Sequence, residues 1–123
     1  MIRVFVYGTL MKNCYNHQAY LAGQRYLGRA VLPGYALYNL GSYPGVIPDI
    51  REKVLGEVYE INRQVLEQLD QLEDNGRLYI RKFAWVWINN SKLIAEVYVW
   101  NGKVRAADKI AFSSQPWQDG YVV

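Results

Sequence analysis

Residues 63–73 carry the strongest helical pattern in the chain, and this pattern limits the folds that are available to it. Four apolar side chains share the spacing that lines one face of an α-helix, namely Val65, Leu66, Leu69 and Leu72. Asn62 is suited to cap the first turn, and Asn75-Gly76 is a stop signal after the last. A helix with one apolar face must bury that face against another element, so the remainder of the chain has to supply a sheet or further helices.

Runs of β-branched and aromatic residues on both sides of this helix predict strands. The expected strands are residues 2–7, 26–32, 35–40, 54–61, 78–88 and 93–100. Pro33-Gly34 predicts a turn between the second and third strands, and residues 89–92 predict a hairpin connection between the last two. Gly56, inside a strand, predicts a bulge or a close approach of another backbone.

One weaker helical spacing, over residues 13–22, predicts a second, short helix. The tail from residue 101 is less periodic and predicts a loop or short helix, in which Trp117 anchors the packing. The order of elements therefore predicts an α+β fold, a small mixed β-barrel-like sheet with two or so short helices. The length and the lack of a linker predict a single domain over residues 1–123.

Charge and composition argue against several classes of protein. The formal net charge is +3, but the basic residues are dispersed and form no run of five or more, which disfavours a nucleic-acid partner. We expect no membrane association, because no apolar stretch approaches the roughly 20 residues that span a bilayer. The N-terminus shows no signal-type pattern, so a cytoplasmic protein is expected.

Aromatic residues alternate along the predicted hairpin, at Trp85, Trp87, Tyr98 and Trp100. This alternation favours packing in the core over a platform for stacking nucleic-acid bases, because few basic residues are interleaved with it.

Cys14 is the single cysteine and His17 the single histidine. Their spacing on a helix would allow a thiolate–imidazole pair, although an inert thiol and a surface histidine are favoured. No second His or Cys stands at ligand spacing, so we expect neither a metal site nor a cofactor.

Two segments could carry chemistry. In Tyr7-Gly8-Thr9-Leu10 a strand ends at glycine, and the amides that follow could bind a carboxylate or polarise a carbonyl, although glycine there could equally serve only a turn. Glu73 follows Leu66 and Leu69 on the buried side of the helix, where burial and the helix C-terminus would raise its pKa. A glutamate with a raised pKa suits proton transfer near neutral pH, whereas the alternative places Glu73 at the polar edge, in water.

Together these segments resemble the γ-glutamyl cyclotransferase family, which includes γ-glutamylamine cyclotransferase and AIG2-like proteins. The resemblance covers roughly residues 2–100 and rests on short motifs: Tyr7-Gly8-Thr9-Leu10, Pro33-Gly34-Tyr35, Tyr43-Pro44-Gly45, Leu69-Asp70-Gln71-Leu72-Glu73 and Tyr79-Ile80-Arg81.

The resemblance implies an enzyme of the lyase or acyltransferase type that acts on a small γ-glutamyl substrate. In this family the α-amino group of the substrate attacks its own γ-carbonyl carbon, which releases 5-oxoproline and an amine or amino acid. Glu73 matches the general acid/base, and the segment from Tyr7 through Gly8 and Thr9 to Leu10 matches the loop that holds the glutamyl group. Tyr79 and Tyr98 match aromatic residues of the pocket.

One departure from the family pattern concerns the residues after the glutamate. Asp74-Asn75 precede Gly76 here, whereas many relatives place glycine directly after the glutamate, so Asp74 could alter the pKa of Glu73. The alternative function is a non-catalytic module that binds a small ligand on the same scaffold. The leaving amine and the oligomeric state stay open at this point.

Overall fold

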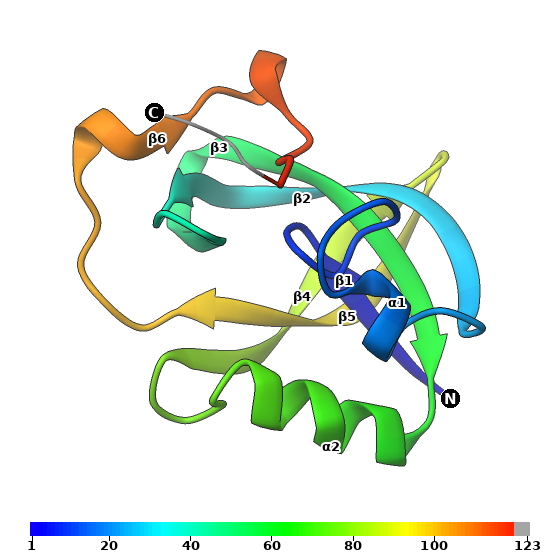
Figure 1. Cartoon of the computed structure of the whole chain (residues 1–123). Helices are drawn as coiled ribbons and strands as arrows, with labels where there is room; N and C mark the ends of the chain where they lie inside the picture. Colours follow the sequence, from blue (N-terminus) through cyan, green and yellow to red (C-terminus); the bar gives the residue numbers. More distant parts are fainter. Residues whose placement is uncertain (120–123) are drawn as a thin grey trace.

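The computed structural model describes residues 1–119 and confirms an α+β fold (Figure 1). Its helices are α1 (His17–Tyr20) and α2 (Arg63–Leu72), with short 3₁₀ turns η1 (Ala106–Asp108) and η2 (Phe112–Ser114). Its strands are β1 (Ile2–Val6), β2 (Arg25–Asn39), β3 (Pro44–Ile61), β4 (Tyr79–Ile88), β5 (Ser91–Trp100) and β6 (Lys109–Ile110). The fold is therefore dominated by strands, as the sequence predicts.

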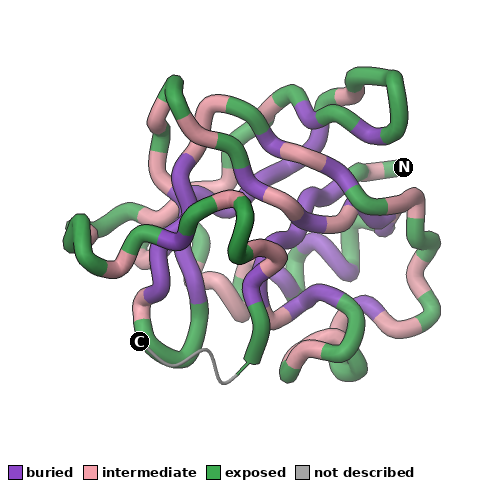
Figure 2. The backbone as a smooth tube through the Cα atoms, turned by 90° about the horizontal axis from the view of Figure 1, so that it is seen from above, coloured by how far each residue is buried: buried purple, intermediate pink, exposed green. Residues whose placement is uncertain are grey.

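The strands form one mixed, six-stranded sheet in the order β3-β1-β5-β4-β2-β6. β1 lies parallel to β5 and antiparallel to β3, and β2 pairs with β3 as well as with β4, so the sheet curls back on itself. In Figure 2 buried positions alternate along these strands with less buried ones. β1 lies within this curl, with Val4 and Phe5 fully buried, and its end points to the site described below.

The turn predicted at Pro33-Gly34 is wrong. β2 runs without reversal from Arg25 to Asn39, and Pro33-Gly34 marks a bulge: Pro33 pairs with Lys53 and Tyr35 with Pro48, which leaves residues 49–52 of β3 without partners in β2. The long antiparallel pairing with β3 outweighs the local turn preference of Pro-Gly. Gly34 adopts a φ of 82°, which glycine tolerates, so the strand continues through the bulge. The chain reverses instead at residues 40–43, where the Leu40 amide donates to the Tyr43 carbonyl.

Gly56 has the close backbone approach that its position predicts. A Cβ at this position would lie 2.3 Å from the carbonyl oxygen of Val6 and 2.6 Å from Cζ of Phe5. Glycine therefore lets β3 approach the end of β1 closely at this position.

Helix α2 begins where the sequence predicts, at Arg63, and ends one residue earlier than predicted, at Leu72, with Glu73 as its C-cap. The Asn62 side chain accepts a hydrogen bond of 2.9 Å from the Val65 amide, and the apolar stripe packs into the core. The other predicted helix, over residues 13–22, is reduced to α1. Asn13 adopts a φ of 67°, which is incompatible with a right-handed helix, and the preceding residues form turns.

The sequence predicts that the four alternating aromatic residues of the hairpin pack in the core. This prediction is wrong for two of them. Trp85 and Trp87 are 53% and 45% exposed, whereas Tyr98 is buried and Trp100 packs against the core. α2 covers this face of the hairpin only as far as Tyr98, which Asp70 contacts. The tip of the hairpin extends beyond α2 (Figure 1), so no helix covers the two indole rings, and the Lys92 ammonium group lies 5.3 Å and 5.5 Å from their centroids.

The tail packs back on the sheet through β6, which pairs with β2, and through Trp117, which is buried as predicted. Within residues 1–119 we find no helix with the length and apolar character needed to cross a membrane.

Candidate active site

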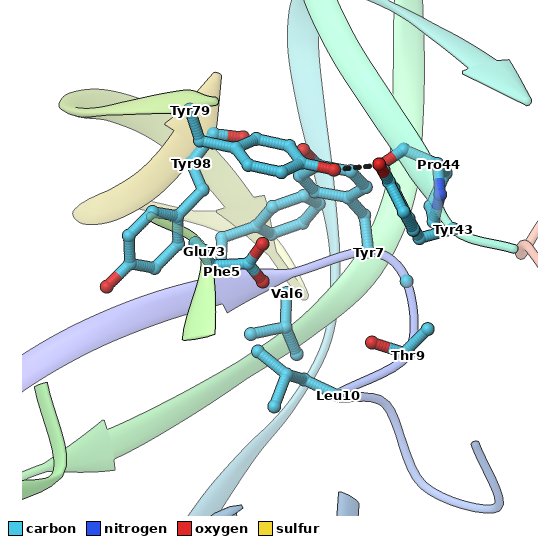
Figure 3. A pocket seen from close by; sticks show the side chains of 11 residues that line it. Phe5, Val6, Tyr7, Thr9, Leu10, Tyr43, Pro44, Glu73, Tyr79 and Tyr98 are labelled. Carbon is cyan, nitrogen blue, oxygen red and sulfur yellow. Dashed lines mark hydrogen bonds between the residues drawn. The ribbon is translucent and has the colours of Figure 1, made fainter. Parts of the chain in front are cut away.

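A pocket lies where the loop after β1 meets the C-terminal end of α2 (Figure 3). Every residue that the sequence singles out for the site lines this pocket: Tyr7, Gly8, Thr9, Leu10, Glu73, Tyr79 and Tyr98. Four further residues that the sequence pattern did not single out also line it, Phe5, Val6, Tyr43 and Pro44. Of these, Tyr43 and Pro44 stand in one of the motifs quoted above and could have been found by their place in it.

Glu73 follows the last turn of α2, and its amide is held by the carbonyl of Leu69 at 2.9 Å. Its carboxylate points inward, toward the space between the Tyr79 and Tyr98 rings and the loop that carries Thr9 and Leu10 (Figure 3). Among the described residues none donates a hydrogen bond to this carboxylate or forms an ion pair with it. Burial without a partner raises the pKa of Glu73 from 4.5 to about 7.

Asp74 does not contribute to this shift of the pKa. Its carboxylate forms an ion pair with Arg77, and its φ of 52° ends the helix at this point. Desolvation alone accounts for the raised pKa of Glu73. The residues that separate Glu73 from Gly76 therefore change the turn and leave the electrostatics of the glutamate unaltered.

The loop after β1 presents backbone donors to the same pocket. No residue in the part of the chain that the structure describes accepts a hydrogen bond from the amides of Gly8, Thr9 or Leu10. The loop is held by its carbonyl groups and side chains instead: the Gly8 carbonyl accepts from Met11, and the Thr9 carbonyl accepts from Asn16. A Cβ on Gly8 would lie 2.7 Å from the Pro44 ring, so glycine is needed for this approach. Amides arranged in this way can bind an oxygen of a ligand.

Three tyrosines wall the pocket and use their hydroxyl groups for structural bonds. Tyr7 donates to the Tyr98 carbonyl at 2.6 Å, and Tyr79 donates to the Pro44 carbonyl at 2.7 Å. Burial raises the pKa of each phenol, and the nearby Glu73 carboxylate raises them further. These phenols therefore stay protonated near neutral pH, and their hydrogen bonds join β1 to β5 and β4 to the start of β3.

An ion-pair network that the sequence analysis assigns no role lies next to the pocket, although Asp70 and Arg81 stand in two of the motifs quoted above. Arg81 donates to both carboxylate oxygens of Asp70, at 2.9 Å and 3.2 Å, and to Glu96 at 3.0 Å. Tyr98 donates to Asp70 at 2.7 Å. Because Asp70 precedes Glu73 by one helical turn, this network ties the end of α2 to the hairpin that carries the pocket tyrosines.

Cys14 and His17 are not part of the pocket. Cys14 lies in a turn before α1, so the helical spacing assumed for the pair is wrong. His17 Nδ1 lies 2.9 Å from the Leu10 carbonyl, and its ring packs against Tyr59. Burial raises the pKa of the Cys14 thiol, which disfavours a reactive thiolate.

A second, larger cavity of about 640 Å³ adjoins the pocket. The pocket and the larger cavity share four lining residues, Thr9, Tyr43, Glu73 and Tyr79. The two spaces therefore adjoin at Glu73. A ligand bound across this junction would place its central atoms beside a carboxylate that can gain or lose a proton near neutral pH and close to unpaired amides. Such an arrangement fits acid/base chemistry on a small polar ligand.

Comparison with known proteins identifies the class to which this fold and site belong. The model of the family described as "Gamma-glutamyl cyclotransferase, AIG2-like" matches residues 4–119, and the chain belongs to this family. It is 34% identical to the Escherichia coli protein "Gamma-glutamylcyclotransferase family protein YtfP" over 94 residues, which cover 71% of this chain and 81% of that protein.

Two further relatives extend the comparison. A Bos taurus protein named gamma-glutamylaminecyclotransferase is 34% identical over 109 residues, which cover 79% of this chain and 63% of the relative. The crystal structure of an AIG2-like protein from Mus musculus superimposes with a TM-score of 0.74 at 26% identity, covering 99% of this chain and 88% of that one. Membership of this family supports an enzyme-type activity resembling that of γ-glutamyl cyclotransferases.

Proposed function

We propose that this protein is a γ-glutamyl cyclotransferase that converts a γ-glutamyl amide to 5-oxoproline and a free amine. The glutamyl group occupies the pocket between the loop after β1 and the tyrosines, and the scissile amide lies at Glu73. The observation that carries the proposal is the half-buried Glu73 carboxylate, which has no hydrogen-bond or ion-pair partner among the described residues. It lines the same pocket as Gly8, Thr9 and Leu10, whose amides donate to none of those residues either.

The reaction needs no nucleophile from the enzyme. Glu73 takes a proton from the α-ammonium group of the substrate, and the freed nitrogen forms a bond to the γ-carbonyl carbon. The carbonyl oxygen gains negative charge, which the loop amides stabilise. Glu73 then gives its proton to the leaving nitrogen and takes the second surplus proton from the attacking nitrogen, and the bond from the carbon to the leaving nitrogen breaks. The second proton passes from Glu73 to the released amine, which departs as an ammonium ion, and 5-oxoproline keeps one N–H. The chain's main contribution besides the proton transfers is to hold the amine and the carbonyl together.

The test is to incubate the protein with γ-glutamyl amides and to follow 5-oxoproline by mass spectrometry. We expect 5-oxoproline and the free amine in equal amounts. Calorimetric binding of these compounds without any product would contradict the proposal and would favour a binding module.

The dependence of the activity on pH follows from the pKa of Glu73. Because the carboxylate must be ionised to take the proton, kcat/KM should rise about tenfold per pH unit below pH 7 and level off above it. The measurement is kcat/KM between about pH 5 and 9 with one γ-glutamyl amide. A rise centred near 4.5 instead would indicate a carboxylate in water and would contradict the assigned base.

A further inference from the structure

Four large apolar side chains are exposed together on one side of the hairpin that β4 and β5 form. They are Phe83, Trp85 and Trp87 of β4 and Ile94 of β5, with exposed fractions of 73%, 53%, 45% and 45%. Alternate residues of a strand share a face, and Trp85 lies directly opposite Ile94, so the four form one surface, which we call the hairpin face. An apolar surface of this kind marks a site of interaction.

The hairpin cannot remove these side chains from water by turning over. Its other side carries Val86, Ala95 and Val97, which are all buried in the core. Because side chains alternate between the two faces of a strand, a rotation that buried the rings would expose these three residues instead. The hairpin also extends beyond α2 (Figure 1), so no described helix covers the rings. Contact with another molecule would take the hairpin face out of water.

The area of the hairpin face agrees with the apolar centre of a dimer interface. With about 200 Å² for each whole side chain, the exposed fractions amount to roughly 400 Å². Each partner of a stable interface contributes about 800 Å², with an apolar centre and a polar rim. The hairpin face is large enough for the centre, and the exposed polar residues 89–92 beside it can supply part of the rim.

The charges beside the hairpin face favour an apolar partner over a charged one. Lys92 lies opposite Trp87, and Glu96 lies opposite Phe83. Glu96 is buried and accepts a hydrogen bond from Arg81, and the Lys92 ammonium group already lies over two indole rings of its own chain. A single ammonium group in this position offers little to a strongly acidic partner, and the buried carboxylate offers nothing to a basic one.

A second copy of the chain has the surface that fits. A twofold axis near Trp85 and Ile94, the central pair of the hairpin face, would lay one face antiparallel on the other. Lys92, at one end of the face, would then lie near Phe83 of the partner subunit, at the other end, where a cation–π contact can form. The two ammonium groups would stand apart, so this arrangement brings no like charges together.

We propose that this protein is a homodimer in which the two hairpin faces pack against each other. The four side chains of the face line neither the pocket nor the larger cavity. The dimer is therefore independent of the proposed function, and either can fail without the other.

Sedimentation equilibrium of the full chain measures the association directly. We expect the wild type to approach the mass of two chains as its concentration rises from about 1 to 100 μM. Trp85→Arg places a charge at the centre of the interface twice in each dimer, so it should raise the Kd of the dimer about 100-fold or more. Phe83→Arg should act in the same direction and is a second, independent variant.

Ile50→Arg is the matched control. Ile50 is 94% exposed, but it lies in the part of β3 where Asp49 and Glu52 bind Lys109, away from the hairpin. This substitution should leave the Kd of the dimer unchanged. Far-UV circular dichroism of the three variants should match that of the wild type, because each replaces an exposed side chain.

Three results would overturn the inference. The first is a wild type with the mass of one chain at every concentration. The second is a wild-type dimer that survives both Trp85→Arg and Phe83→Arg, since the interface would then lie elsewhere. The third is a monomeric wild type that sediments with vesicles of phosphatidylcholine and phosphatidylserine and loses this binding in Trp85→Arg, which would assign the hairpin face to a lipid surface.

Discussion

Replacement of Glu73 by Gln should lower the rate of 5-oxoproline release by about 10²–10⁴-fold, because it removes the group that transfers both protons and keeps the shape of the side chain. The loss should appear in kcat as well as in kcat/KM, since the amide still fills the pocket and still admits the substrate. The measurement is the steady-state rate with a γ-glutamyl amide for the wild-type protein and the variant. Glu67→Gln is the matched control, because Glu67 lies on the same helix but is exposed and lines neither cavity.

The free energy of unfolding of Glu73→Gln, measured as a function of pH, distinguishes a loss of activity from a loss of fold. The pKa of Glu73 is raised in the folded protein, so the folded state binds more protons than the unfolded state between pH 4.5 and about 7. Over this interval the free energy of unfolding of the wild type should fall as the pH rises, by up to about 3 kcal/mol. Glu73→Gln should lack this fall and be at least as stable as the wild type above pH 7. An inactive variant that is also unfolded at that pH would contradict the account.

Replacement of Arg81 by Met should lower the free energy of unfolding by about 3 kcal/mol. Among the described residues Arg81 is the one cation that joins Asp70 to Glu96, and Glu96 is 7% exposed. The substitution therefore leaves a buried carboxylate without a partner in this part of the chain. Urea unfolding measures this loss as a lower midpoint at an unchanged slope.

Arg105→Met is the matched control for this prediction. Arg105 also donates two hydrogen bonds to one carboxylate, that of Asp108, but its side chain is 79% exposed. Exposed pairs contribute little, so this substitution should leave the midpoint nearly unchanged. Equal losses in the two variants would show that burial of Glu96 has no special cost. Adding Glu96→Gln to Arg81→Met should restore part of the lost stability, because it removes the unpaired charge.

Features set by local periodicity were predictable from the sequence. Helix α2, its cap at Asn62 and the position of Glu73 on its inner side follow from a spacing that involves neighbouring turns alone. The close approach at Gly56 is of the same kind, since a glycine inside a strand often marks a bulge or a close contact between two backbones.

Features set by distant parts of the chain were not predictable. Whether Pro33-Gly34 makes a turn or a bulge depends on the pairing of β2 with β3 along its whole length. Whether Trp85 and Trp87 are covered depends on how far α2 reaches across the hairpin. The larger cavity beside the pocket combines Tyr15, Tyr43 and Leu78 from separate loops, and no spacing in the sequence relates them.

The central claim is that the substrate's own amine, and not water, attacks the γ-carbonyl carbon beside Glu73. The most direct measurement is the mass of the product formed from a γ-glutamyl amide in water labelled with the heavy oxygen isotope. Attack by the amine predicts 5-oxoproline without label, formed by the wild type and lost in Glu73→Gln. Labelled glutamate as the first product would show hydrolysis and would contradict the account.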